Sequence, residues 1–353
     1  MLIASIWMEK KLNFKKGGIR MSQLKLSAGL VIGLTALAAL PVSAGTNTIN
    51  VEPVEVVTGV AKAQLMVGVE SWSGDNTYQI GNPVHWFDGT VDQGYFPFSE
   101  LAFPLDIAMV TAQANVEFYD TWMFMGSVKK NVTDPDDQMI DKDWITDANP
   151  SQLDVYSNSN ITDFDGYEFD FSVKYKFLQG ENWSLDGGAG YLYQNWQYEA
   201  SVVRQYSPSG LDGFDYLGDG RPAIRYTLEY NIPYFQVGGK VKLGNKVSLL
   251  SRLSYSPWVD AENVDQHMLR YKVNKGDLDG YSWMFKVEGQ YDFSEHWFMT
   301  ASYDYKQMKV DGTMRAEFAN FYEYIYGVVP NHTVWEEIES VQHAMAITVG
   351  YHF

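Results

Sequence analysis

Hydrophobic and polar residues alternate along most of the chain with a period of two. In the segment 169–177, large apolar side chains occupy the odd positions and polar or charged ones the even positions. The segments 283–293, 297–305 and 345–353 repeat this alternation. Successive side chains of a β-strand point to opposite faces, so the pattern predicts strands with one apolar and one polar face. A helical period of 3.6 residues is almost absent, and we expect an all-β protein.

Turn-like and polar segments divide the chain into ten expected strands. Short turns are predicted near residues 118–121, 178–183, 244–246 and 294–296, and long polar connections near 73–97, 132–166, 204–224, 261–280 and 311–340. Alternating short and long connections are typical of barrels with tight periplasmic turns and long outer loops. The expected strands fall roughly at 60–72, 100–115, 121–131, 166–177, 183–203, 224–243, 246–260, 281–293, 297–310 and 339–353. Pro233 interrupts the sixth of them, where we expect a bulge.

The N-terminal segment is typical of a secretory signal peptide. Residues 21–25 form a short basic start, residues 26–40 are apolar, and Val42-Ser43-Ala44 matches the small-x-small cleavage pattern, so that the mature chain would begin near Gly45. Residues 1–20 then represent an over-called start or a long basic segment. A membrane anchor is the alternative interpretation, but the apolar run is short and no stop-transfer charges follow it.

Three features favour a membrane barrel over a soluble β-sandwich. The signal peptide directs the chain out of the cytoplasm, aromatic residues cluster at strand ends as they do at membrane interfaces, and the chain ends on an amphipathic strand with Phe353 last. We therefore expect a signal-peptide region over 1–44 and one domain over 45–353. That domain would be a ten-stranded antiparallel transmembrane β-barrel with long extracellular loops, located in the bacterial outer membrane.

Composition narrows the possible functions. The chain has no cysteine, which excludes disulfides, zinc-thiolate sites and a cysteine nucleophile. Its formal net charge is −18, and this argues against nucleic-acid partners, which need basic patches. The acidity could steer cationic ligands toward the protein, or it could only keep the loop surface soluble.

Two of the expected outer loops carry residues with the chemistry of a hydrolase. Asp141 and Asp143 lie in the segment 132–166, and Asp265 and His267 lie two residues apart in 261–280. A carboxylate beside a histidine can orient the ring and stabilise its protonated form, as a base that activates water requires. Two carboxylates at i and i+2 on an extended segment share a side, so they can share a proton or hold a water molecule. A closed barrel could bring both pairs together at its rim.

Other interpretations of these residues remain open. An Asp-x-Asp sequence in an acidic loop is most often solvated surface, and the several aspartates of residues 134–143 would also suit Ca²⁺, which prefers many oxygen ligands. An isolated Asp-x-His pair is more often structural than catalytic.

At these positions the sequence resembles the omptin family of outer-membrane proteases. The run 141–144 followed by Asn149-Pro150 resembles the family's Asp-x-Asp-Trp and Asn-Pro motifs, and Trp258-Val259 with 265–267 resembles its Trp-Val and Asp-x-His motifs. The segments 167–170, 220–226 and 233–234 are also similar to family sequences. The resemblance extends over essentially the whole mature chain.

The resemblance implies an aspartic-type endopeptidase in which no metal takes part. Asp265 and His267 would form the dyad that activates water, and Asp141 and Asp143 would position the water and stabilise the tetrahedral intermediate. The family's acidic residue two positions before the catalytic aspartate falls on Asn263, and its partner acid in the first loop falls near Tyr78. A pocket for basic side chains is therefore not matched, unless Asp260 or Glu262 substitutes.

The resemblance also implies partners. These are peptide or protein substrates, the outer membrane, and lipopolysaccharide as an activating lipid. Two other functions compete with the protease: a non-enzymatic barrel, such as an adhesin or a narrow porin, and a lipid-modifying barrel enzyme. A porin requires an open lumen, whereas a protease of this kind requires a lumen filled by side chains.

Overall fold

The computed structural model describes residues 61–86, 88–318 and 332–353. The predicted signal-peptide region 1–44 and the expected start at Gly45 lie outside the described residues. Within the described ranges no helix is long and apolar enough to cross a bilayer. The strands are β1 (Ala61–Trp86), β2 (Val91–Asp92), β3 (Ser99–Pro104), β4 (Ala108–Phe118), β5 (Trp122–Asn131), β6 (Gln138–Asp143), β7 (Val155–Gln179), β8 (Trp183–Tyr206), β9 (Tyr216–Leu217), β10 (Ile224–Leu243), β11 (Val247–His267), β12 (Lys272–Asp292), β13 (Trp297–Phe318) and β14 (His332–His352).

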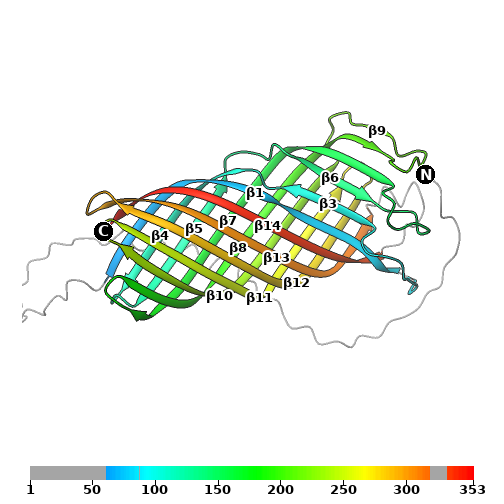
Figure 1. Cartoon of the computed structure of the whole chain (residues 1–353). Helices are drawn as coiled ribbons and strands as arrows, with labels where there is room; N and C mark the ends of the chain where they lie inside the picture. The colour runs from blue at the N-terminus through cyan, green and yellow to red at the C-terminus, as the bar shows by residue number, and fades with distance from the viewer. Residues whose placement is uncertain (1–60, 87, 319–331) are drawn as a thin grey trace, which may run out of the picture. The chain divides into compact units, whose positions relative to one another are not determined.

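The strands form one closed antiparallel sheet (Figure 1). Closure follows from β1, which pairs with β4 on one side and with β14 on the other. Two positions in the ring are each built from two successive strands, β3 with β4 and β5 with β6, while β2 and β9 are short strands at its edge. The ring therefore has ten strand positions, and the predicted all-β, ten-stranded barrel is confirmed.

The predicted short turns all occur, and they lie at the end of the barrel that holds the C-terminus (Figure 1). Between β4 and β5, Tyr119 and Asp120 have φ angles of 52° and 54°. Positive φ at both central residues is the geometry of a two-residue hairpin turn whose twist matches that of the strands. Gly244, with a φ of 78°, adopts a positive φ in the turn between β10 and β11.

At the opposite end, the strands extend well beyond the predicted limits. The expected loop 73–97 is largely strand, because β1 continues to Trp86. The expected loop 261–280 is almost entirely strand, and only residues 268–271 join β11 to β12. Pairing continues without interruption through this region, with Asp265 opposite Asn274. The prediction of long loops here is therefore wrong.

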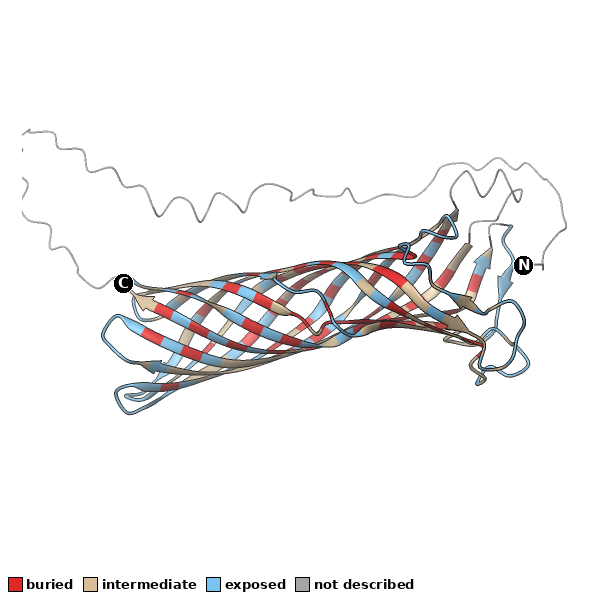
Figure 2. Ribbon diagram, turned by 90° about the horizontal axis from the view of Figure 1, so that it is seen from above, coloured by how far each residue is buried: buried red, intermediate tan, exposed pale blue. Residues whose placement is uncertain are grey.

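The error has a physical cause, which β12 illustrates. Its outward positions change from charged to aromatic along the strand, with Asp277 and Asp279 before Tyr281, and Trp283 and Phe285 after it. Between Asn274 and Met284 nearly all inward positions are buried, whereas those nearer the short turn, such as Lys286 and Glu288, are partly exposed (Figure 2). The period of two thus continues, but its polarity reverses, so that the projecting half of each strand has a polar outer face and a packed interior. Strands predicted from apolar outer faces therefore include only the membrane-spanning half and miss the projecting half.

An outward band of apolar side chains surrounds the half of the barrel that ends in the short turns. Such a band next to a polar lumen is the arrangement of a transmembrane barrel. Its exposed members include Leu65, Val67, Val69, Val110, Phe124, Phe169, Phe171, Phe177, Leu185, Phe235, Val237, Leu249, Leu253, Trp283, Phe285, Met299, Met345, Ile347 and Val349.

The expected bulge occurs in β11 and not at Pro233 of β10. Between the pairs Asn231–Asp260 and Phe235–Tyr255, β11 has one residue more than β10, and its ladder with β12 also shifts between Ser256 and Val259. β10 keeps its alternation past Pro233 and stays paired with β8. The ring nitrogen of proline cannot donate a ladder hydrogen bond, and Pro233 is placed where the ladder to β11 is already interrupted.

The middle of the lumen is closed by buried ion pairs. Glu168 lies 3.0 Å from Lys129 and 2.6 Å from Lys306, measured between carboxylate oxygen and ammonium nitrogen, and Lys129 also lies 3.1 Å from Glu70. Both ammonium groups stand over the ring of Trp72, at 5.1 and 4.3 Å from its centre. All five side chains are less than a tenth exposed. They leave no room for a continuous water-filled channel at this level.

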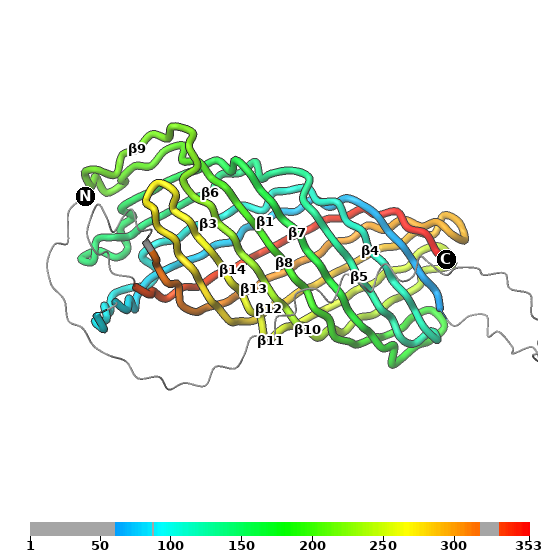
Figure 3. Tube along the Cα trace, turned by 180° about the vertical axis from the view of Figure 1, so that it is seen from behind, coloured from blue at the N-terminus to red at the C-terminus, as the bar shows by residue number. Residues whose placement is uncertain are grey.

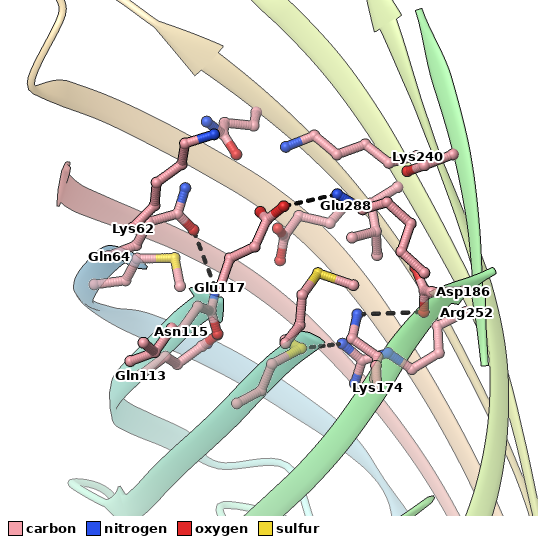
Figure 4. A pocket seen from close by; sticks show the side chains of 18 of the residues that line it. Lys62, Gln64, Gln113, Asn115, Glu117, Lys174, Asp186, Lys240, Arg252 and Glu288 are labelled. Atoms are coloured by element: carbon pink, nitrogen blue, oxygen red, sulfur yellow. Dashed lines mark hydrogen bonds and ion pairs between the residues drawn. The ribbon is translucent and has the colours of Figure 1, made fainter. Parts of the chain in front are cut away.

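On the other side of these ion pairs, toward the short turns, the lumen widens into a cavity of about 670 Å³ (Figure 4). Charged and amide side chains line it, and some are paired between neighbouring strands, such as Lys174 of β7 with Asp186 of β8. The cavity is thus a polar lumen of the membrane-spanning half, separated from the projecting half by the ion pairs around Glu168.

We predict that Glu168→Ala destabilises the barrel by about 3–5 kcal/mol, because it leaves the buried charge of Lys306 unpaired and Lys129 half-compensated. The free energy of unfolding in detergent, from denaturant titration followed by circular dichroism, measures the effect. Glu317→Ala is the matched control, since Glu317 pairs with Lys275 and Arg315 at the exposed surface and should cost less than about 1 kcal/mol. Equal losses in the two variants would contradict a buried, closing role for Glu168.

Candidate active site

The end of β11 places an aspartate and a histidine on the inner face of the barrel. Nε2 of His267 lies 2.8 Å from Oδ2 of Asp265. Two residues apart on a strand, the side chains share a face, which allows the contact without distortion. Asp265 is completely buried, while 14% of the His267 side chain remains exposed. The imidazole therefore stands between a buried carboxylate and the outside.

Two further side chains hold the Asp265 carboxylate. The hydroxyl of Tyr78, from β1, donates to Oδ2 of Asp265 at 2.7 Å, and the amide of Asn274, from β12, donates to the same oxygen at 3.3 Å. Burial opposes ionisation of Asp265, but the charge and hydrogen bond of His267 and the hydroxyl of Tyr78 outweigh it and lower the pKa of the carboxyl group. Asp265 is thus a buried, ionised group fixed by three neighbours.

Aromatic rings pack around Tyr78 on the lumen side of the dyad. The ring of Tyr226 lies 5.4 Å from that of Tyr78 and 4.3 Å from that of Phe103, and Tyr198 lies 5.0 Å from Phe103. All four side chains are at most 1% exposed. This aromatic layer keeps water of the lumen away from Asp265, so that its hydrogen bonds act in a medium of low dielectric.

A second acidic pair comes from β6. Asp141 lies opposite Leu101 of β3, and Asp143 lies opposite Ser99. Burial is the main cause that raises the pKa of both carboxyl groups; the charge of Asp143 raises the pKa of Asp141 further, whereas the Ser99 hydroxyl partly offsets the shift of Asp143. Two close carboxyl groups cannot both ionise easily, so the pair tends to share one proton.

One cavity of about 300 Å³ joins the two pairs. Asp141 and His267 both line it, although 126 positions separate them in the sequence. Its lining residues come from β6 to β11 and from the turn after β11, and Figure 3 shows β6 and β9 at the end of the barrel opposite the C-terminus. Its other lining residues are Ser157, Ser159, Val202, Gln205, Tyr216, Ala223, Ile224, Leu269 and Arg270. The structure thus brings the two predicted segments to one solvent-accessible space.

The three predicted substrate-binding residues do not all reach this space. Asp260 and Glu262 are exposed on the outer wall, because they alternate along β11 with the buried residues Ala261 and Asn263. The side chain of Asn263 points inward but is 2% exposed and fully engaged: its amide donates to Glu336, and its oxygen accepts the backbone N–H of Gly276. The structure therefore does not bring Asp260 or Glu262 to the dyad.

Glu336, from β14, is a buried acid beneath the site. A Cβ atom on Gly276 would lie 2.2 Å from its Oε2, so only glycine leaves room for this carboxyl group. Burial raises the pKa of Glu336 to about 8, and the charge of Asp265 contributes to the shift. The group is therefore mostly uncharged at neutral pH.

The acidic segment 134–143 does not gather around a common centre. The backbone N–H groups of Asp136 and Asp137 both donate to Oδ2 of Asp106. Within the described ranges, no three histidine, aspartate or glutamate residues are arranged to hold a metal ion. The segment is shaped by these backbone contacts.

Sequence reasoning missed Asn274 and Arg270 and gave Tyr78 no role at the dyad. Asn274 is the cross-strand neighbour of Asp265, and the correct four-residue turn between β11 and β12 would have predicted it. Arg270 lies in that same turn. Tyr78 carries no such signal, because it reaches Asp265 across the barrel interior from β1.

The closed ten-stranded barrel thus carries a paired aspartate and histidine at its projecting rim. The model of the omptin family matches residues 97–324, about two thirds of the sequence. The chain belongs to the omptin family. As a member of this family, it is an outer-membrane protease.

The fold is similar to that of a solved outer-membrane protease. The crystal structure of the outer membrane protease OmpT from Escherichia coli superposes with a TM-score of 0.68 at 16% identity, covering 83% of this chain and 97% of that one. The translocator domain of the autotransporter NalP from Neisseria meningitidis (9% identity, 85% and 90% coverage) and a Pseudomonas aeruginosa FadL homologue (11%, 83% and 90%) give TM-scores of 0.35 and 0.28. Among curated protein sequences, none matches the chain significantly.

The raised pKa of Glu336 predicts a pH dependence of stability. Folding raises this pKa from 4.5 to about 8, so the folded state binds more protons than the unfolded state within that window. The stabilising contribution is complete below about pH 4.5 and is lost as the pH rises through about 8. We expect Glu336→Gln, which keeps the shape and cannot ionise, to flatten the decline of the unfolding midpoint between about pH 5 and pH 9.

Thermal unfolding in detergent, followed by circular dichroism, measures this difference. Glu339→Gln is the matched control, because Glu339 is exposed on the outer face of the same strand and its variant should follow the wild-type profile. Identical profiles for Glu336→Gln and the wild type would show that Glu336 does not titrate in this window.

Proposed function

We propose that the protein is an endopeptidase that hydrolyses peptide bonds at the rim cavity, on the extracellular side of the outer membrane. The observation that carries this proposal is the cavity shared by Asp141 and His267, with Asp265 in contact with the imidazole behind it. The rim lies at the end opposite the short turns, which in barrels of this kind face the periplasm. Substrates would therefore arrive from outside the cell.

His267 acts as the general base in the proposed reaction. With its Nε2–H donated to Asp265, the imidazole carries its free electron pair on Nδ1, which can take a proton from a water molecule in the cavity. Asp265 holds the ring in this tautomer and stabilises the positive charge that develops on it. Tyr78 and Asn274, which donate to Asp265, are positioning residues.

The pair Asp141 and Asp143 completes the reaction from the opposite side. An ionised carboxylate of the pair accepts a hydrogen bond from the attacking water and orients it. The shared proton allows the other carboxyl group to donate a hydrogen bond to the oxyanion of the tetrahedral intermediate, where negative charge develops. The raised pKa values of both groups support this division.

The competing functions have less support. A narrow porin needs a continuous lumen, but the ion pairs around Glu168 and the aromatic layer around Tyr226 close it. An adhesin has no need for a buried ionised aspartate behind a half-buried histidine. A lipid-modifying enzyme would place its reactive groups beside the membrane, whereas the dyad lies on the projecting half, beyond the apolar band.

Substitution of the dyad tests the proposal directly. We expect His267→Ala and Asp265→Ala each to lower kcat/KM on a mixed peptide library by about 10²–10⁴-fold, because each removes base catalysis. Asp260→Asn is the control, since this exposed residue points away from the cavity and should leave cleavage unchanged. Cleavage that survives in both alanine variants would exclude the assigned roles, and ion conductance by the wild type would favour the porin.

We also infer that lipopolysaccharide activates the protein, as the family resemblance implies. We expect the barrel purified in detergent to cleave peptides when lipopolysaccharide is added and to lose most of that activity in phospholipid alone. Initial rates of cleavage with the two lipids, at equal amounts of folded barrel, measure this dependence. Equal rates would rule out a specific requirement.

A further inference from the structure

The turn between β11 and β12 brings an unpaired cation to the cavity. Arg270 lies in this turn, and its backbone N–H donates to the carbonyl oxygen of His267 at 3.1 Å. Its side chain is exposed and lines the cavity together with Asp141 and His267. Within the described part of the chain, no carboxylate lies within ion-pair distance of the Arg270 guanidinium. Its donors are therefore available to a ligand.

Arg270 is also close enough to the acidic pair to act on it. Its positive charge lowers the pKa of both Asp141 and Asp143 and so partly offsets the effect of burial. Burial raises the pKa of both carboxyl groups, which favours a proton shared by the pair, and neither carboxylate forms an ion pair with Arg270 in the described part of the chain. A substrate carboxylate would thus meet a guanidinium that is near the reacting groups and still free.

The cavity offers no comparable partner for a basic side chain. Asp141 is the only acid that lines it among the described residues, and Asp141 belongs to the reacting pair. Beneath the dyad, the amide of Asn263 is fully engaged and Glu336 is uncharged near neutral pH. The acids Asp260 and Glu262 lie on the outer wall. Apart from Asp141, which is engaged in the proposed reaction, a lysine or arginine of the substrate would find only neutral groups such as Ser157, Ser159 and Gln205.

We propose that Arg270 is a specificity-determining residue and that the rim cavity accepts an acidic side chain, aspartate or glutamate, from a peptide residue next to the scissile bond. This inference rests on the proposed endopeptidase function and adds its substrate class. The guanidinium presents donors in a planar fork that matches a carboxylate. Because Arg270 is exposed to solvent, the contribution is modest, and we expect about a tenfold preference.

The overall charge of the protein does not decide this preference. The net charge of −18 would slow the approach of any acidic peptide, but at about 0.15 M salt the Debye length is only about 8 Å. Within the cavity, a bound peptide lies close to the positive charge of Arg270 and is largely screened from distant charges. Measurements should therefore be made at physiological salt.

The test uses peptides that differ at one position. Peptides blocked at both ends carry glutamate, glutamine or lysine at each position flanking the cleaved bond, and kcat/KM is measured with the full-length folded barrel. We expect glutamate to exceed glutamine about tenfold at one of these positions, with lysine lowest. Arg270→Gln should remove the preference by slowing cleavage of the glutamate peptide alone, and Arg270→Lys should restore part of it.

Arg221→Gln is the matched control, since Arg221 is exposed and ion-paired with Asp219 in the connection before β10, and its variant should keep the wild-type preference. A peptide with neutral side chains and a free C-terminal carboxylate separates the two sources of a carboxylate. If only this peptide depends on Arg270, the arginine binds chain ends and the proposal is overturned. A preference for lysine, or a glutamate preference that survives Arg270→Gln, overturns it as well.

Binding distinguishes failure of this inference from failure of the proposed function. If the wild type cleaves none of the peptides, the endopeptidase proposal fails, and the Arg270 inference is judged on affinity alone. In the His267→Ala background, the glutamate peptide should bind about tenfold more tightly than the glutamine peptide, and this difference should vanish with Arg270→Gln. Equal affinities for the two peptides would overturn the inference even if cleavage is observed.

Discussion

Everything in this structure depends on closure of the sheet, in which β1 pairs on one side with β4 and on the other with β14. Closure leaves no strand edge unpaired in the membrane, where an unmet backbone group would be costly. It also fixes the register of every strand relative to its neighbours. A side chain at a given height therefore has determined partners across the interior, and Tyr78 and Asp265 meet for this reason.

The sequence pattern predicts the barrel and its short turns because both are local. Alternation in 283–293 reflects a strand whose outer face is lipid-exposed, and Gly244 marks a tight turn. The extension of the strands could not be predicted in the same way, because its outer face is charged and its inner face apolar, as Asp277 and Leu278 show. Local polarity alone does not distinguish such a projecting wall from a solvated loop.

The proposed catalytic residues are visible in the sequence as short motifs, but their surroundings are not. Asp265-x-His267 and Asp141-x-Asp143 are recognisable from spacing, whereas the partners of Asp265 depend on register and on contacts through the interior. Glu336 illustrates the limit. Its buried, uncharged state follows from the small volume at Gly276 and from the hydrogen bond of Asn263, two facts that only the assembled ring creates.

The extra residue in β11 sets the direction in which Asp265 and His267 point. Before it, even-numbered residues such as Ser254 face inward; after it, odd-numbered ones such as Val259 do. Suppose that this one residue were removed and the pairing of residues 247–256 with the neighbouring strands were kept. Asp265 and His267 would then point toward the surrounding medium, and Gln266 would point toward the cavity. The orientation of the proposed dyad is in this sense encoded by a count of residues near Pro257, about eight positions upstream of Asp265.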